Sequence, residues 1–106
     1  MIPEIDVDEL EARMEAGAAL IDVREVDEYQ EAHVPGARLL PLSELDRRIG
    51  DLSPDEVLLL ICKSGARSMR AAALLAGHGI DVTNVAGGTM AWMASGRDIA
   101  TGMERG

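Results

Sequence analysis

A single cysteine, Cys62, is the most reactive side chain in this sequence. It stands in the segment LICKSGARS, residues 60–68, where an apolar run gives way to small and cationic residues. A thiol becomes a nucleophile only as its thiolate, and nearby cations and backbone amides favour that form. The segment therefore predicts one reactive sulfur whose pKa lies below the roughly 8.5 of a free thiol.

We expect the residues after Cys62 to wrap around its sulfur as a six-residue loop. Inward backbone N–H groups would form a nest for an anion, and a helix starting near Ser68 would add the positive end of its dipole. Gly65 permits positive φ. Lys63 and Arg67 supply two cations. The predicted loop comprises Cys62, Lys63, Ser64, Gly65, Ala66 and Arg67. The alternative is that Cys62 is simply a small buried apolar residue.

The elements that must position this loop alternate along the chain. Apolar runs predict strands over 18–23, 38–40, 57–61 and 80–85. Helical spacing, caps and stop residues predict helices over 6–16, 25–31, 43–49, 68–76 and 90–94. Such alternation indicates an α/β domain with a mainly parallel sheet and helices on both faces. Ligands bind such sheets at the carboxyl ends of strands, where Cys62 falls.

Composition narrows the function further. A chain of 106 residues is one domain, and its formal net charge of −9 argues against nucleic-acid or anionic-membrane binding. One cysteine makes neither an intramolecular disulfide nor a thiolate zinc site. We see no signal peptide, and the longest aliphatic run, 57–61, is too short to span a bilayer, so a cytoplasmic location is expected.

Three motifs, in order, resemble those of the rhodanese superfamily. IDVRE at 21–25, EY at 28–29 and HVPGA at 33–37 are similar to its first signature. CKSGAR at 62–67 resembles its active-site loop, and GGTMAW at 87–92 with Gly96 resembles its C-terminal signature. The resemblance implies a single rhodanese-like domain with a five-stranded sheet, covering about 7–96. The tail over 97–106 is expected to be loose.

The resemblance also implies an activity. Cys62 would take a sulfane sulfur from a donor, become a persulfide and pass the sulfur to a nucleophilic acceptor. The loop amides would hold the charged sulfur, and Arg67, with Lys63 as a second candidate, would bind an anionic donor such as thiosulfate. The acceptor would be cyanide, a thiol or a thioredoxin-like protein. Neither a metal nor an organic cofactor is implied, and the oligomeric state stays open.

Two other functions are weighed against sulfur transfer. Related phosphatases carry one more residue between cysteine and arginine, and that larger ring fits a phosphate, so the four residues between Cys62 and Arg67 favour sulfur transfer. Rhodanese-like domains that lack the cysteine serve as binding or regulatory modules, and the presence of Cys62 disfavours this function.

Several residues outside the loop are expected to support it. Asp22 and Arg24 follow a strand end and could reach the site, but the resemblance implies that they mainly brace neighbouring loops. Ser68, just after the loop, is expected to be a further supporting residue. His33, beside a Pro-Gly turn, would hold a loop, because a thiolate held by amides needs no general base. Met90, Trp92 and Met93 are expected in the core or in a pocket wall.

Overall fold

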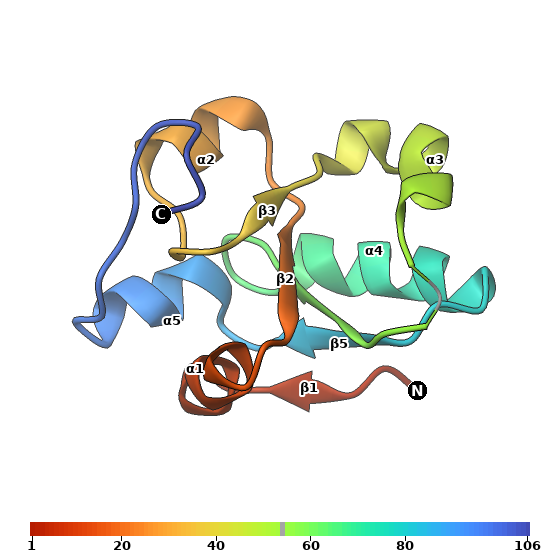
Figure 1. The fold of residues 1–106 in the computed structure, drawn as a ribbon, viewed down its shortest axis with the longest axis horizontal. Coiled ribbons are helices and arrows are strands. Elements are labelled where there is room, and N and C mark those ends of the chain that lie inside the picture. The colour runs from red at the N-terminus through yellow and green to blue at the C-terminus, as the bar shows by residue number, and fades with distance from the viewer. Residues whose placement is uncertain (54) are drawn as a thin grey trace.

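A parallel sheet organises the chain, which a computed structural model describes over residues 1–53 and 55–106 (Figure 1). Within these residues the sheet has five strands in the order β1-β5-β4-β2-β3, and every pairing is parallel. The strands are β1 (Glu4–Ile5), β2 (Ala19–Asp22), β3 (Arg38–Leu39), β4 (Leu58–Ile61) and β5 (Val82–Val85). The apolar strand β4 lies at the centre, as its sequence predicts.

The helices cover both faces of this sheet. They are α1 (Val7–Glu15), α2 (Val26–Glu31), α3 (Leu45–Arg48), α4 (Ala66–Gly77) and α5 (Gly88–Ala94). Short 3-10 turns, η1 (Leu42–Glu44) and η2 (Ile49–Asp51), flank α3. The expected helix over 43–49 is therefore broken into three short pieces. No helix of the described residues is both long and apolar enough to cross a membrane.

Strand β4 explains how the two layers of helices are held. Leu58 and Leu60 enter the cluster that contains residues of α3 and α4, whereas Leu59 and Ile61 enter the one that contains residues of α1, α2 and α5. All four side chains are buried. Burying each contributes about 1.5–3 kcal/mol to folding, so the two cores fix the strand from both sides.

Two predicted helix starts shift toward the predicted loop, and one strand is new. Helix α4 starts at Ala66, two residues earlier than expected, because Gly65 takes a left-handed φ of 109° and caps it. Helix α5 likewise starts at Gly88, two residues early. The strand β1 was not expected, since two residues carry no periodicity. It joins the sheet where the Asn84 amide bonds the carbonyl of Pro3 and the Ala86 amide that of Ile5.

The C-terminal tail is not loose, contrary to the prediction. The segment after α5 runs back beside α2 (Figure 1). His33 and Ala100 form an antiparallel bridge, with N–O distances of 2.9 and 2.8 Å. The amide of Gly102 donates to the carbonyl of Gln30 at 2.8 Å. These are backbone bonds, and the polar side chains of the tail gave no sign of them.

Candidate active site

Cys62 follows β4 directly, at the carboxyl edge of the sheet. Its side chain is 1% exposed. The amide of Gly65 donates to Sγ at 3.1 Å, and the hydroxyl of Ser68 approaches Sγ at 3.3 Å. The left-handed turn at Gly65 brings both donors to the same sulfur, since it bends the chain from the strand into α4.

These donors decide the acidity of the thiol. Burial raises the pKa of Cys62, as it does for any group that becomes an anion. Hydrogen bonds from the Ser68 hydroxyl and from the amides of Ser68, Gly65 and Ser64 favour the thiolate and outweigh that burial. The pKa of Cys62 therefore lies below its ordinary value, and the site is arranged for an anion on sulfur.

Helix α5 holds the loop from behind. The amide of Thr89 donates to the carbonyl of Cys62 at 2.8 Å, and that of Met90 to the carbonyl of Lys63 at 3.0 Å. Gly88 makes this approach possible. A Cβ built there would lie 2.4 Å from the Cys62 carbonyl oxygen and 2.6 Å from that of Lys63. Gly88 thus has a physical reason, which is backbone packed directly on backbone, whereas a Cβ at Gly87 would lie 2.7 Å from the Cβ of Ala91.

Arg67 is paired with a carboxylate, whereas the sequence predicts a cation that is free to bind a donor. Its guanidinium forms a two-bond ion pair with Glu28 of α2, with both N–O distances at 2.7 Å. The hydrogen bond from Arg67 is the main cause that lowers the pKa of Glu28 to about 2. Arg67 is therefore a compensated cation that ties α4 to α2, rather than the free cation the sequence suggested. Lys63 is exposed.

The pair Asp22 and Arg24 forms a buried brace. Asp22 ends β2, and its carboxylate accepts the Arg24 backbone amide at 3.0 Å and the Arg24 Nη2 at 2.9 Å. The same Nη2 donates to the carbonyl of Ala32 at 2.7 Å. This geometry links the end of β2 to the end of α2, as a loop-bracing role requires.

The ring of His33 bonds to α2 and to the C-terminal segment. Its Nδ1 is 2.8 Å from the carbonyl oxygen of Tyr29, and its Nε2 is 2.7 Å from that of Glu104. Its ring stacks on Tyr29, with centroids 3.6 Å apart. The residue joins α2 to the C-terminal segment, and that placement fits loop support better than proton transfer.

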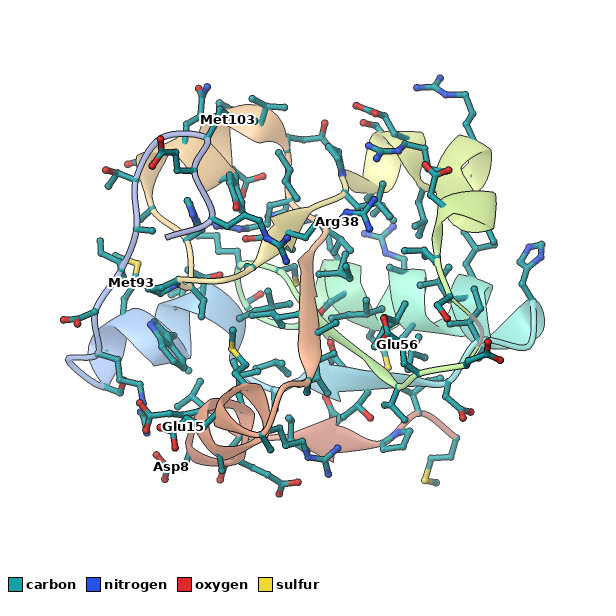
Figure 2. The ribbon with its side chains drawn as sticks, viewed as in Figure 1. Asp8, Glu15, Arg38, Glu56, Met93 and Met103 are labelled. Atoms are coloured by element: carbon teal, nitrogen blue, oxygen red, sulfur yellow. The ribbon has the colours of Figure 1, made fainter. Side chains whose placement is uncertain are left out.

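A pocket of about 390 Å³ adjoins the loop. Three exposed apolar side chains form one wall: Met90 (54% exposed), Met93 (47%) and Ile99 (42%). Figure 2 shows Met93 beside the C-terminal segment that carries Ile99. The remaining lining is polar or small: Arg24, Glu28, Glu31, Ala32, Lys63 and Thr89. Of the expected core residues, Trp92 is buried, whereas the two methionines form pocket wall.

Sequence reasoning missed three residues of this site. The motif at 28–29 predicts no role for Glu28, although Glu28 pairs with Arg67. The sequence pattern assigns no role to Asn84 of β5 or to Glu4 of β1. Asn84 accepts a hydrogen bond from Ser68 and donates to Glu4 at 2.9 Å. For Asn84, the one signal in the sequence is its position three residues before the glycine pair at 87–88.

Among residues 1–53 and 55–106, no group of three or more histidine, cysteine or acidic side chains is placed to hold a metal ion.

Comparison with known proteins identifies the family. Residues 6–95 match the family described as Rhodanese-like domain. The chain is 36% identical over 94 residues to the putative sulfur carrier protein YrkF of Bacillus subtilis, covering 86% of this chain but about half (51%) of that protein. A sulfurtransferase of Allochromatium vinosum is 33% identical over 102 residues, covering 93% of this chain and 95% of that one. A crystal structure of a rhodanese-related protein from Thermoplasma volcanium superposes with a TM-score of 0.87 at 27% identity, over 96% and 99% of the two chains.

Proposed function

Because the chain belongs to the rhodanese-like domain family, we propose that it is a sulfurtransferase that carries sulfur as a persulfide on Cys62. One observation supports this most. The sulfur lies within a six-residue loop whose amides, with the Ser68 hydroxyl, favour a negative charge there.

The transfer takes two balanced steps. The Cys62 thiolate attacks the sulfane sulfur of thiosulfate, a new S–S bond forms, the old S–S bond breaks, and its electron pair leaves with sulfite. A nucleophile such as cyanide then attacks the outer persulfide sulfur, and thiocyanate leaves while the Cys62 thiolate is restored. Two displacement steps through a covalent intermediate give ping-pong kinetics.

Loading followed by intact mass spectrometry tests this function. Incubation with thiosulfate is expected to add one sulfur atom to the protein, and cyanide is expected to remove it. Cys62→Ser is the matched control, because it replaces only the sulfur and is expected to stay unloaded. A protein that gains no sulfur from thiosulfate or from any organic persulfide contradicts the proposal. Cys62-dependent hydrolysis of an aryl phosphate would instead favour the phosphatase alternative.

The pocket supports an organic substrate at one of the two steps. A small dianion such as thiosulfate gains little from the apolar wall of Met90, Met93 and Ile99, and the carboxylate of Glu31 repels it. A low-molecular-weight thiol or persulfide suits the pocket better. Its carbon chain would pack on the methionines, and its charged groups would face Lys63 and Glu31.

A pair of methionine variants tests this substrate class. Met93→Ser removes part of the wall and is expected to lower kcat/KM for glutathione persulfide about 3- to 10-fold, while thiosulfate loading changes far less. Met103→Ser is the control, since Met103 is similarly exposed and lies in the C-terminal segment outside the pocket lining (Figure 2). Equal losses for both substrates would contradict the assignment of the pocket.

A further inference from the structure

The hydroxyl of Ser68 has one proton and three acceptors within reach. Its Oγ lies 3.3 Å from Sγ of Cys62 and 3.2 Å from the carbonyl oxygen of Gly65, and it also bonds Oδ1 of Asn84. A serine hydroxyl donates one hydrogen bond at a time. Whatever fixes the direction of this proton therefore decides how well Ser68 stabilises a charge on Cys62.

The side chain of Asn84 is held in one orientation. It is buried in β5, and its Nδ2 donates to Oε2 of Glu4 at 2.9 Å and to the carbonyl oxygen of Gly65 at 3.3 Å. Turning the amide over would place Oδ1 against two oxygens that only accept hydrogen bonds. Glu4 therefore keeps Oδ1, an acceptor, directed at Ser68.

We propose that Asn84, anchored by Glu4, is a positioning residue that competes with the Cys62 sulfur for the Ser68 proton. In the thiol, the S–H of Cys62 donates to Oγ while Ser68 donates to Asn84, and all bonds are made. In the thiolate, the Ser68 proton turns to the sulfur, and Oδ1 loses its donor. The chain Glu4–Asn84–Ser68 thus restrains the formation of the free thiolate.

The loaded state avoids this loss. In a persulfide the charge lies on the outer sulfur and Sγ has neither a proton nor a formal charge, so Ser68 remains bonded to Asn84. This part alone rests on the proposed sulfur transfer. The arrangement favours the loaded form over the free thiolate, which is the balance that a sulfur carrier needs.

Neighbouring charges do not cause this preference for the loaded form over the free thiolate. Arg67 is paired with Glu28, and Lys63 is exposed. Glu4 acts through Asn84, since its carboxylate accepts from Nδ2. The direction of the Ser68 proton, rather than a local excess of charge, therefore sets how stable the Cys62 thiolate is.

Titration of Cys62 in the unloaded protein tests the proposal without a sulfur donor. Thiolate absorbance and the rate of alkylation by iodoacetamide are followed against pH. Ser68→Ala removes a donor and is expected to raise the pKa of Cys62 by about one unit, a tenfold change in thiolate at low pH. Asn84→Ala removes the competing acceptor. Because a thiolate attracts the proton more strongly than the carbonyl of Gly65 does, the pKa is expected to fall by about half a unit.

The opposite signs distinguish positioning from loss of structure. General loosening of the loop would move both variants toward the value of a free thiol. Glu4→Ala, on an exposed edge, removes the acceptor of the Asn84 amide without cutting into the core, and it is expected to shift the pKa in the same direction as Asn84→Ala. Glu15→Ala removes the same charge from α1 and is expected to leave the pKa unchanged. Shifts of equal sign in Ser68→Ala and Asn84→Ala, or no shift in Glu4→Ala, would overturn the proposal. Failure of sulfur loading would leave these titrations intact, so the two proposals fail separately.

Discussion

Replacing Gly88 by alanine tests whether the active-site loop depends on direct backbone contact with α5. The new Cβ would lie 2.4 Å from the Cys62 carbonyl oxygen, whereas an ordinary van der Waals contact begins at 3.4 Å. The loop or the helix must therefore move by roughly 1 Å. The positive φ of 58° adds a cost of about 1–2 kcal/mol for any residue with a Cβ.

We expect Gly88→Ala to lower the free energy of unfolding by about 2–5 kcal/mol, from overpacking and from backbone strain together. Sulfur loading is expected to slow by about 10- to 100-fold, since a shift near 1 Å at a reacting group costs up to about a hundredfold. Urea unfolding measures the first effect, and persulfide formation followed by intact mass measures the second.

Gly17→Ala is the matched control. Gly17 also has a positive φ, 97°, but nothing lies within 4 Å of its added Cβ. This control carries the backbone strain without the clash, and it is expected to cost about 1–2 kcal/mol and leave loading unchanged. If the two variants were equally stable and loaded at equal rates, the contact between Gly88 and the loop would not matter, and the reasoning would be wrong.

Three further changes test other parts of the structure. The lowered pKa of Glu28, about 2 when folded against 4.5, means that its ion pair stabilises the fold above pH 4.5 and is lost as the pH falls toward 2. Glu28→Gln is therefore expected to lower the unfolding free energy by about 1–2 kcal/mol at pH 7, discounted for exposure, and hardly at all at pH 2. Tyr29→Phe leaves the buried carbonyl of Ala37, now bonded at 2.5 Å, without its donor, and should cost about 1–3 kcal/mol in urea unfolding. His33→Ala is expected to speed hydrogen exchange in 97–106 and leave β4 protected; unchanged exchange there would show that His33 does not hold the tail.

The local part of the site could be predicted from the sequence. Residues 58–66 alone predict the apolar strand, the loop at its end and the glycine that turns the loop. The pairings of Arg67 with Glu28 and of Ser68 with Asn84 are long-range, 39 and 16 residues apart, and depend on which side chains the folded sheet brings together. No spacing rule contains that information.

The tail shows a different limit. The sequence over 97–106 predicts a loose end, because the pattern of side chains carries no signal for hydrogen bonds between backbone groups. Besides the bond from the His33 ring to Glu104, the tail is held by bonds between backbone groups of Ala100, His33, Gly102 and Gln30, which any sequence could make. The start of α4 was misplaced for a related reason, since a glycine cap is defined by its dihedral angles.

The burial of Cys62 has a consequence for how the protein behaves in air. A disulfide between two molecules needs their sulfur atoms about 2.05 Å apart and their Cα atoms within about 7 Å. Cys62 is a residue that is 1% exposed, and its sulfur accepts hydrogen bonds from its own loop, so it cannot approach a second copy so closely while the fold is intact. The native protein should therefore resist covalent dimerisation during storage without reductant. Small oxidants should react with the Cys62 thiol faster than a second protein molecule does.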